Sequence, residues 1–367
     1  MTEALVAGAG IIGQVAALGL AGQGRKVRLI ERLAAEPSGS GRLFTLNWPA
    51  RRMLARILPA LPPTQPIRQM RIFAPDGQML KFDADAAGIA CLAATVLEDD
   101  LIASLAAARS ATGLSAELDI QPTAATLLAE GWQVTCAGES IAARLLVAAD
   151  GASSPTAKAA GLLRRTAGAT QQIETGWLAT GGTSDAIAWQ WFTPRATLAL
   201  LPAADGRINF ILSRPIDNGK EEQEPVAAEK IIAEVCQSEI GRCRLVDEPR
   251  TFCATPGQIC GHRPRLAPVG DCAQSVYPLS GQGLTVGLGD VEELLDCLAG
   301  ESDPGAGAAL QNYRRRRSLR ARATIEITKF FANANNASSP AARLLGLAAR
   351  VNKTPAAALF AHLANAR

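Results

Sequence analysis

The sequence has very little histidine and no closely paired cysteines. Its 367 residues include only 2 histidines, His262 and His362, and 8 cysteines, none of which is spaced as CxxC from another. Zinc sites are built from such clusters, so no metal site is predicted. Scattered cysteines in a chain of this length indicate buried free thiols in a reducing cytoplasm. We expect the two histidines to be structural or exposed rather than catalytic.

Strong net charge is also absent. The formal net charge is +3, and 19% of the residues are charged. This balance does not favour a nucleic-acid partner, which would require a clear basic excess. Hydrophobic residues make up 48% of the chain, which excludes intrinsic disorder and is enough for a sizeable core. The uncharged stretch 4–24 is interrupted by glycines and has no basic segment before it, so we expect neither a signal peptide nor a membrane span.

The first thirty residues predict a strand, a helix and a second strand. Ala4–Ala7 is a short apolar run typical of a buried parallel strand, residues 14–22 have helical composition, and Lys26–Ile30 is the next strand. Between the first strand and the helix lies the pattern GxGxxG, formed by Gly8, Gly10 and Gly13. Glu31 ends the second strand, at the distance where an acid accepts hydrogen bonds from a ribose 2′-hydroxyl.

This context makes a dinucleotide site the favoured interpretation, with a glycine-rich turn that binds nothing as the alternative. Glycines permit a close approach of the backbone to a pyrophosphate, and open amides at a helix start attract its charge. An acid at position 31 argues against a 2′-phosphate, so the predicted ligand is NAD or FAD rather than NADP.

Two later segments also end strands or open helices. Leu266–Asp271 places a carboxylate after an apolar run, where it either holds polyol hydroxyls or caps the next helix. Tyr277–Gly287 is a second glycine-rich turn before a helix, which either favours the negative charge of a reduced flavin or is an ordinary loop. The middle of the chain is rich in short strands, including 188–192, 198–201 and 208–212, and this spacing predicts an antiparallel sheet.

Taken together, the ordered motifs resemble those of the flavoprotein aromatic hydroxylases with the fold of p-hydroxybenzoate hydroxylase. The motifs are the N-terminal fingerprint, Ala148–Ser154, and Val269–Asp271 followed by the turn through Gly283. Within that group the chain is most similar to the ubiquinone-biosynthesis hydroxylases. The resemblance implies an α/β fold with a Rossmann-like FAD-binding domain, an interleaved antiparallel-sheet substrate domain and a C-terminal helical tail. The corresponding ranges are 1–70, 88–165 and 255–300 for FAD, 71–87 and 166–254 for substrate, and 301–367 for the tail.

The resemblance also implies roles for individual residues. Gly8, Gly10 and Gly13 would hold the FAD pyrophosphate, Glu31 the adenosine ribose and Asp271 the ribityl chain. Arg42 would contact the flavin, and Asp150 with Gly151 would serve both FAD and the nicotinamide donor. The remaining expected cofactor contacts are Ile12, Arg32, Pro278, Gly281, Gln282, Gly283, Leu284 and Thr285. Five positions depart from the family pattern and put FAD affinity in question: Ala94, Thr95, Glu98, Gln274 and Thr285.

The implied activity is the hydroxylation of a polyprenylated phenol in ubiquinone biosynthesis. In the family, NADH or NADPH binds transiently and reduces FAD, and O2 then forms a C4a-hydroperoxide that hydroxylates the ring. No single residue is expected to be the catalyst. We predict that Trp189, Trp191, Phe192 and Leu200 line the substrate pocket, although large apolar residues more often fill a core. The alternatives are a flavin monooxygenase for another aromatic or isoprenoid substrate, and a non-catalytic member that scaffolds a quinone-biosynthesis complex.

The C-terminal region is basic. Residues 301–367 hold 11 Lys or Arg against 3 Asp or Glu, with four consecutive arginines at 314–317. Such a cluster attracts an anionic membrane surface or an acidic partner, or it forms an ordinary solvated helix face. With the free thiols noted above, we expect a cytoplasmic protein. The basic region adds the alternative of peripheral attachment to the inner face of the membrane or to a quinone-biosynthesis complex.

Overall fold

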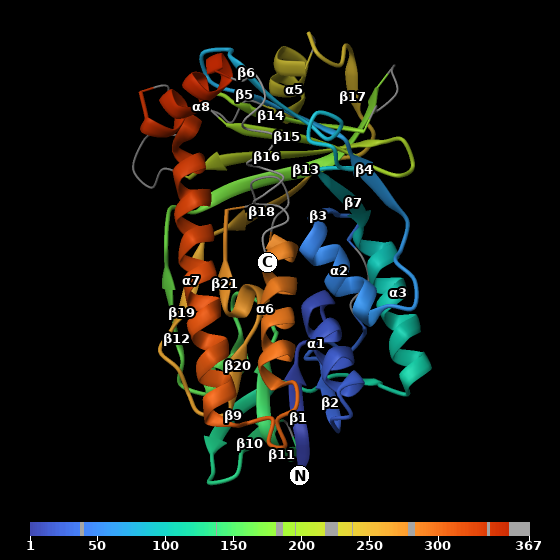
Figure 1. Ribbon diagram of the computed structural model, residues 1–367, viewed down its shortest axis with the longest axis vertical. Helices are drawn as coiled ribbons and strands as arrows, with labels where there is room; N and C mark the ends of the chain where they lie inside the picture. Colours follow the sequence, from blue (N-terminus) through green and yellow to red (C-terminus); the bar gives the residue numbers. More distant parts are fainter. Residues whose placement is uncertain are drawn as a thin grey trace.

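The computed structural model describes residues 1–36, 40–136, 138–180, 186–194, 196–216, 227–236, 238–277, 283–335 and 338–351. Within these residues the molecule has two main layers of sheet, one above the other, with long helices along one side (Figure 1).

The lower layer is a mixed sheet that begins with the predicted strand–helix–strand unit. Its strands are β1 (Thr2–Ala7), β2 (Val27–Ile30), β8 (Ala116–Glu117), β9 (Pro122–Leu127), β10 (Trp132–Cys136), β11 (Glu139–Ala148) and β20 (Leu266–Pro268), in the order β8-β2-β1-β11-β10-β9 with β20 also pairing β11. The pairs from β8 to β11, and β11 with β20, are parallel, which brings the carboxyl ends of β1, β2, β11 and β20 to one edge.

Helices cover the lower sheet because its parallel strands are apolar on both faces. Ala4 and Val6 face a core shared with α1 (Ile11–Gly22), α3 (Glu98–Thr112) and α6 (Gly283–Leu298), whereas Leu5 and Ala7 face a second core. The other helices are α2 (Trp48–Ile57), α4 (Pro155–Ala159), α5 (Ala228–Cys236), α7 (Gly307–Ala332) and α8 (Pro340–Val351), with 3-10 turns at η1 (Gly270–Cys272) and η3 (Asn333–Asn335).

The upper layer is the predicted antiparallel sheet. It contains β5 (Gln69–Phe73), β6 (Met79–Asp83), β13 (Gln171–Thr180), β14 (Ile187–Phe192), β15 (Thr197–Pro202), β16 (Ile208–Pro215), β17 (Cys243–Leu245) and β18 (Arg250–Ala254), in the order β17-β13-β16-β15-β14-β5-β6 with β18 also pairing β13. Helix α5 packs on one face of this sheet, and the opposite face looks toward the lower layer (Figure 1).

Two small sheets join the layers. One contains β3 (Leu43–Leu46), β7 (Ala93–Leu97) and β4 (Thr64–Ile67), and the other β12 (Leu163–Thr166), β19 (Gly257–Cys260) and β21 (Gln274–Ser275). Helix α7 runs beside α6 along the lower layer and reaches the upper layer, where α8 packs near β6 (Figure 1). The chain crosses between layers several times, so both layers contribute to the space between them.

Several predictions of detail can be compared with the structure. All eight cysteines are free, but only Cys91, Cys136, Cys236 and Cys272 are buried, and Cys253 is exposed. His262 is exposed, as expected, and His362 lies outside the described residues. None of the described helices has the length and apolar character needed to cross a membrane.

Candidate cofactor and substrate site

A cavity of about 720 Å³ lies between the edge of the lower sheet and the upper sheet. Many of the predicted cofactor residues lie on its wall: Gly8, Gly10, Ile12, Glu31, Arg32, Arg42, Asp150, Gly151, Asp271, Gly283 and Leu284. They come from segments far apart in the sequence, so the fold brings the separate motifs to one place. Gly13 and Thr285 do not line the cavity, and the expected contacts Pro278, Gly281 and Gln282 lie outside the described residues.

The three glycines of the fingerprint are required for different structural reasons. Gly8 has φ +105°, and a Cβ there would come within 2.6 Å of the Ala149 carbonyl oxygen. A Cβ on Gly13 would lie 1.8 Å from the Gly8 carbonyl oxygen, so this residue lets α1 pack against the loop. Gly10, by contrast, has open space where a Cβ would be, and that space belongs to the cavity. The fold thus requires glycine at positions 8 and 13, whereas Gly10 keeps the cavity clear at the start of α1.

Glu31 holds the fingerprint loop in place. Its carboxylate accepts hydrogen bonds from the amide of Ala9 at 2.7 Å and from the amide of Leu33 at 3.2 Å. The side chain is buried, yet it lies on the cavity wall. A fixed carboxylate at this position can still accept a hydrogen bond from a hydroxyl in the cavity, because each of its oxygens has more than one lone pair.

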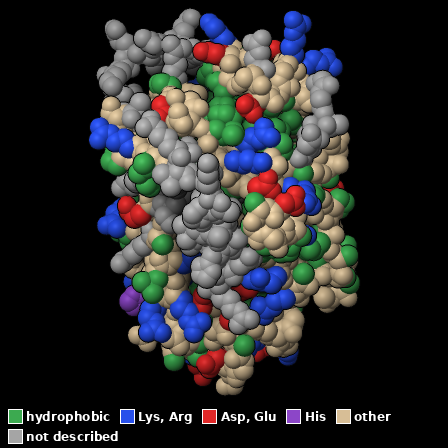
Figure 2. Space-filling view, turned by 45° about the horizontal axis from the view of Figure 1, so that its top comes forward, with side chains coloured by type: hydrophobic (Ala, Val, Ile, Leu, Met, Phe, Trp, Pro, Cys, Tyr) green, Lys and Arg blue, Asp and Glu red, His purple; other side chains and the backbone are tan. Residues whose placement is uncertain are grey.

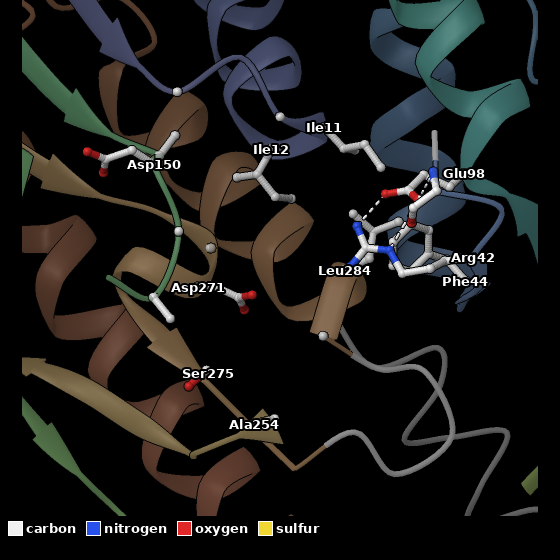
Figure 3. A pocket seen from close by; sticks show the side chains of 18 of the residues that line it. Ile11, Ile12, Arg42, Phe44, Glu98, Asp150, Ala254, Asp271, Ser275 and Leu284 are labelled. Atoms are coloured by element: carbon white, nitrogen blue, oxygen red, sulfur yellow. Dashed lines mark hydrogen bonds and ion pairs between the residues drawn. The ribbon is translucent and has the colours of Figure 1, made fainter. Parts of the chain in front are cut away.

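Asp150 and Asp271 lie on the same side of the cavity but point in different directions (Figure 3). The Asp150 carboxylate accepts from the hydroxyl of Ser154 and, at 2.9 Å, from the amide of Thr156, so it closes the start of the short helix α4. The Asp271 carboxylate instead points into the cavity. Burial raises the pKa of Asp271, and the nearby guanidinium groups of Arg164 and Arg42 oppose that rise.

Side chains of α6 and α7 hold the backbone next to Asp271 in place. The amide of Gly270 donates to the Asp290 carboxylate on α6 at 3.1 Å, and the hydroxyl of Tyr313 on α7 donates to the Pro268 carbonyl at 2.6 Å. Both acceptor and donor side chains are buried. Arg164 adds a hydrogen bond to the carbonyl of Asp271 itself at 2.9 Å. The turn is therefore rigid, which is what a binding carboxylate requires.

Close packing also ties the two glycine-rich segments together. Ile12 fills the space where Gly270 and Gly287 have no side chain: added Cβ atoms would lie 3.1 Å and 2.7 Å from Ile12 side-chain carbons. Thr285 donates to the Thr45 carbonyl at 3.0 Å, joining the start of α6 to β3. Thr285 thus has a structural contact in this chain, and the start of α6 lies against the fingerprint helix.

Arg42 and Glu98 form an ion pair on the opposite side of the cavity from Asp271 (Figure 3). The Glu98 carboxylate also accepts from the amide of Ser40 at 2.8 Å and from its hydroxyl at 2.5 Å. Burial by itself raises the pKa of Glu98, but hydrogen bonds from Arg42 and Ser40 outweigh it, so the pKa lies below its usual value. Glu98 is therefore charged at neutral pH and neutralises the arginine that the resemblance assigns to the flavin.

We predict that Glu98→Gln strengthens FAD binding about tenfold, because it removes an anion from the cavity wall and frees the Arg42 charge for the cofactor. The same change should lower the free energy of unfolding by about 1–2 kcal/mol, since a charge-assisted pair is lost. Titration of FAD followed by fluorescence quenching measures the first effect. Asp99→Asn is the matched control, because Asp99 is the next residue on α3 and is exposed. Weaker FAD binding in Glu98→Gln would show that Glu98 supports the site.

The four residues expected to line the substrate pocket do not line this cavity. Alternate residues of a strand face opposite sides, and Trp189, Trp191 and Leu200 face α5, on the far side of the upper sheet from the cavity. Trp191 stacks on Phe73 there, with ring centroids 5.1 Å apart. Phe192 packs in a separate apolar cluster that includes Ala341 and Leu345 of α8. These four large apolar residues fill cores, and none of them lines the cavity.

The upper sheet instead presents β13 and β16 to the cavity. Ile173, Thr175, Asn209 and Ile211 line it, together with the segment Phe252–Thr255. Asn209 is buried, and its amide donates to the Gly176 carbonyl at 2.9 Å. No sequence motif marked these residues. The signal that could have located them is the alternation along β13 and β16, once the pairing of those strands is known.

Two of the remaining departures from the family pattern have clear structural roles. The hydroxyl of Thr95 donates to the Pro202 carbonyl at 2.6 Å and so links β7 to the upper sheet, and Ala94 is buried beside it. Gln274 differs, because its side-chain nitrogen and oxygen are buried and have no hydrogen-bond partner among the described residues. Nothing in the structure explains that glutamine.

Comparison with known proteins identifies the family of this chain. The family described as "FAD binding domain" matches residues 94–328. The chain belongs to this FAD-binding family. This match confirms the predicted cofactor, FAD, and the relatives and solved structures that follow confirm the resemblance to the flavoprotein hydroxylases.

Curated relatives of this flavoprotein include ubiquinone hydroxylases. It is 29% identical over 241 residues to the ubiquinone hydroxylase UbiL of Rhodospirillum rubrum, an alignment covering 61% of this chain and 54% of the relative. It is 29% identical over 187 residues to the 3-demethoxyubiquinol 3-hydroxylase of Escherichia coli, covering 49% and 48%. The alignments thus span about half the length of these relatives.

Solved structures confirm the predicted fold. The aromatic hydroxylase CabE of angucycline biosynthesis superposes with a TM-score of 0.73 at 20% identity, covering 99% of this chain and 75% of that one. HpxO of Klebsiella pneumoniae, solved with FAD and uric acid, gives a TM-score of 0.70 at 19% identity, covering 95% and 91%.

Proposed function

We propose that this flavoprotein is an NAD(P)H-dependent monooxygenase that hydroxylates a phenol carrying an isoprenoid chain, as a step of ubiquinone biosynthesis. One observation carries the proposal: a single cavity joins the dinucleotide fingerprint to the face of β13 and β16 that presents Ile173 and Ile211. The names of the ubiquinone hydroxylases among its relatives support the choice of substrate.

The residues present fit FAD. Gly8 and Gly13 close the backbone around the start of α1, and Gly10 leaves open space in front of its amides, where a pyrophosphate would be held. Glu31 and Asp271 both line the cavity, and in this proposal their carboxylates bind the adenosine ribose and the ribityl hydroxyls, respectively. Asp150 and Gly151 also line the cavity. When bound, FAD supplies electron transfer from NAD(P)H and activation of O2, chemistry that side chains lack.

The protein's own contribution is to orient the ring and exclude water. Ile173 and Ile211 offer an apolar surface between which a ring and the start of an isoprenoid chain can lie. Asn209 supplies a polar group on this face. Its side-chain nitrogen donates to the Gly176 carbonyl. Among the described residues, the only donor to its side-chain oxygen is the Thr175 hydroxyl, at a long 3.5 Å. We assign to that oxygen the acceptance of a hydrogen bond from the phenol.

The Asn209→Leu variant tests this assignment. We expect KM for the phenol to rise about tenfold, with FAD affinity unchanged, because one hydrogen bond to the substrate is lost and the flavin contacts remain. Steady-state oxidation of NAD(P)H, with product measured by mass spectrometry, gives KM and kcat separately. Ser213→Ala is the matched control, because Ser213 is on the same face of β16 but outside the cavity. An unchanged KM in Asn209→Leu would contradict the proposed pose.

Association with a membrane or with a biosynthetic complex remains a proposal that rests on the basic C-terminal region and on the apolar chain of the proposed substrate. The basic excess of residues 301–367 would attract an anionic surface. Sedimentation with vesicles of phosphatidylglycerol at low and high salt tests it. Salt-sensitive sedimentation supports electrostatic attachment, and a soluble protein under both conditions contradicts it.

A further inference from the structure

A second cavity, of about 510 Å³, lies on the flank of the lower layer between α7 and β19. We call it the basic cleft. Its walls are Leu162, Arg165, Gln258, Ile259, Cys260, Gly261, His262, Arg263, Leu266, Pro268, Gln311, Arg314, Arg315, Arg317 and Ser318. It shares no lining residue with the cofactor cavity, so it is a separate site. Figure 2 shows Lys and Arg side chains gathered beside a histidine on this flank.

The lining of the basic cleft is positively charged, and the one nearby carboxylate, that of buried Asp290, lies close to Arg317. Five arginines from three segments line it, and no Asp or Glu does. None of these arginines forms an ion pair within the described residues, whereas Arg316 and Arg320 on the same helix both pair with Glu293. Grouping like charges around one cavity costs free energy unless an anion occupies it. The arrangement therefore favours an anionic ligand.

Arg317 provides an independent indication. Its side chain lies on the wall of the basic cleft but is only 9% exposed, and its Nη1 nitrogen is buried with no hydrogen-bond partner. A buried, unsatisfied guanidinium nitrogen is costly. An anion in the cleft would offset that cost by lowering the local positive potential and by drawing the flexible guanidinium into a hydrogen bond.

We propose that the basic cleft binds the phosphate group of an anionic ligand. Arginine suits phosphate because its planar fork donates two parallel hydrogen bonds to two oxygens. The apolar wall of Leu162, Ile259 and Leu266 leaves room for an organic portion beyond the phosphate. The phosphate belongs either to a soluble phosphate ester or to a lipid headgroup, and the experiment below separates these sources.

The test uses the full chain saturated with FAD, so that the fingerprint cannot bind the probe. Pyrophosphate is titrated by calorimetry, and in parallel the protein is sedimented with vesicles of phosphatidylglycerol in phosphatidylcholine. The variants are Arg315→Gln and Arg165→Gln, two exposed arginines of the cleft, and the matched control is Arg316→Gln, one residue along α7 on a different face. Thermal melting confirms that each variant is folded.

We expect saturable binding that falls about tenfold in each cleft variant and is unchanged in the control, because each lost fork removes a charge-assisted contact. Binding of pyrophosphate with that pattern identifies a soluble phosphate as the source. Binding of vesicles alone with that pattern identifies a lipid headgroup. The absence of any binding would overturn the proposal. An equal loss in Arg316→Gln would also overturn it, because the arginines would then act only through the general positive charge of the surface.

Discussion

Gly10→Ala is expected to weaken FAD binding by up to about 100-fold while leaving the fold nearly unchanged. Gly10 has ordinary backbone angles, φ −64° and ψ 177°, and an added Cβ meets no atom of the protein within 4 Å. The free energy of unfolding should therefore change by less than about 1 kcal/mol. The methyl group would occupy the space in front of the α1 amides, and overpacking of this kind costs about 1–3 kcal/mol of binding.

Two other glycines make the comparison sharp. Gly13→Ala would place a Cβ 1.8 Å from the Gly8 carbonyl oxygen, so we expect it to destabilise the protein as well as to lose FAD. Gly22→Ala is the control, because Gly22 is on the same helix with nothing near its added Cβ. FAD titration and thermal melting on all three variants measure both effects. If Gly10→Ala bound FAD as tightly as the parent, the pyrophosphate would not lie at the start of α1.

Asp290→Asn is expected to stabilise the protein by about 3–4 kcal/mol at pH 8 and to have almost no effect at pH 4. Burial raises the pKa of Asp290 from 3.8 to about 7, and the nearby Arg317 opposes only part of that rise. The folded chain thus keeps a proton that the unfolded chain releases above pH 3.8. The resulting loss of stability grows as the pH rises toward 7 and is constant above it. Asparagine keeps an acceptor for the Gly270 amide and removes the buried charge.

Denaturation by urea at pH 4, 6 and 8 measures this dependence. Asp296→Asn is the matched control, because Asp296 is on the same helix and exposed, and its variant should show no such change with pH. A variant of Asp290 that is equally destabilised at every pH would show that the carboxylate contributes a contact and does not carry a buried charge.

Local patterns were enough to predict the cofactor half of the fold. The apolar run of β1, the spacing of the fingerprint glycines and the acid at position 31 all form a pattern within one short segment of the sequence. The same holds for the start of α3 and for the carboxylate at Asp271, which the structure places on the cavity wall. Such features need only the right spacing, so the sequence alone shows them.

The substrate side could not be predicted in the same way. Which face of β14 becomes a core depends on α5, which lies more than thirty residues later in the chain, and this partner turns Trp189 and Trp191 away from the cavity. The basic cleft is a similar case. Arg314–Arg317 are visible in the sequence, but Arg165 and Arg263 join them only through the pairing of β12 with β19 and the packing of α7.

The most direct test of the proposed function is a single assay on the purified, FAD-loaded protein. NAD(P)H oxidation is followed at increasing concentrations of a short-chain prenylphenol, and the product is analysed by mass spectrometry. We predict that the phenol stimulates oxidation and is converted into a product one oxygen atom heavier. Conversion of unprenylated, water-soluble phenols only, or a flavin that NAD(P)H reduces without any oxygenated product, would contradict the proposal.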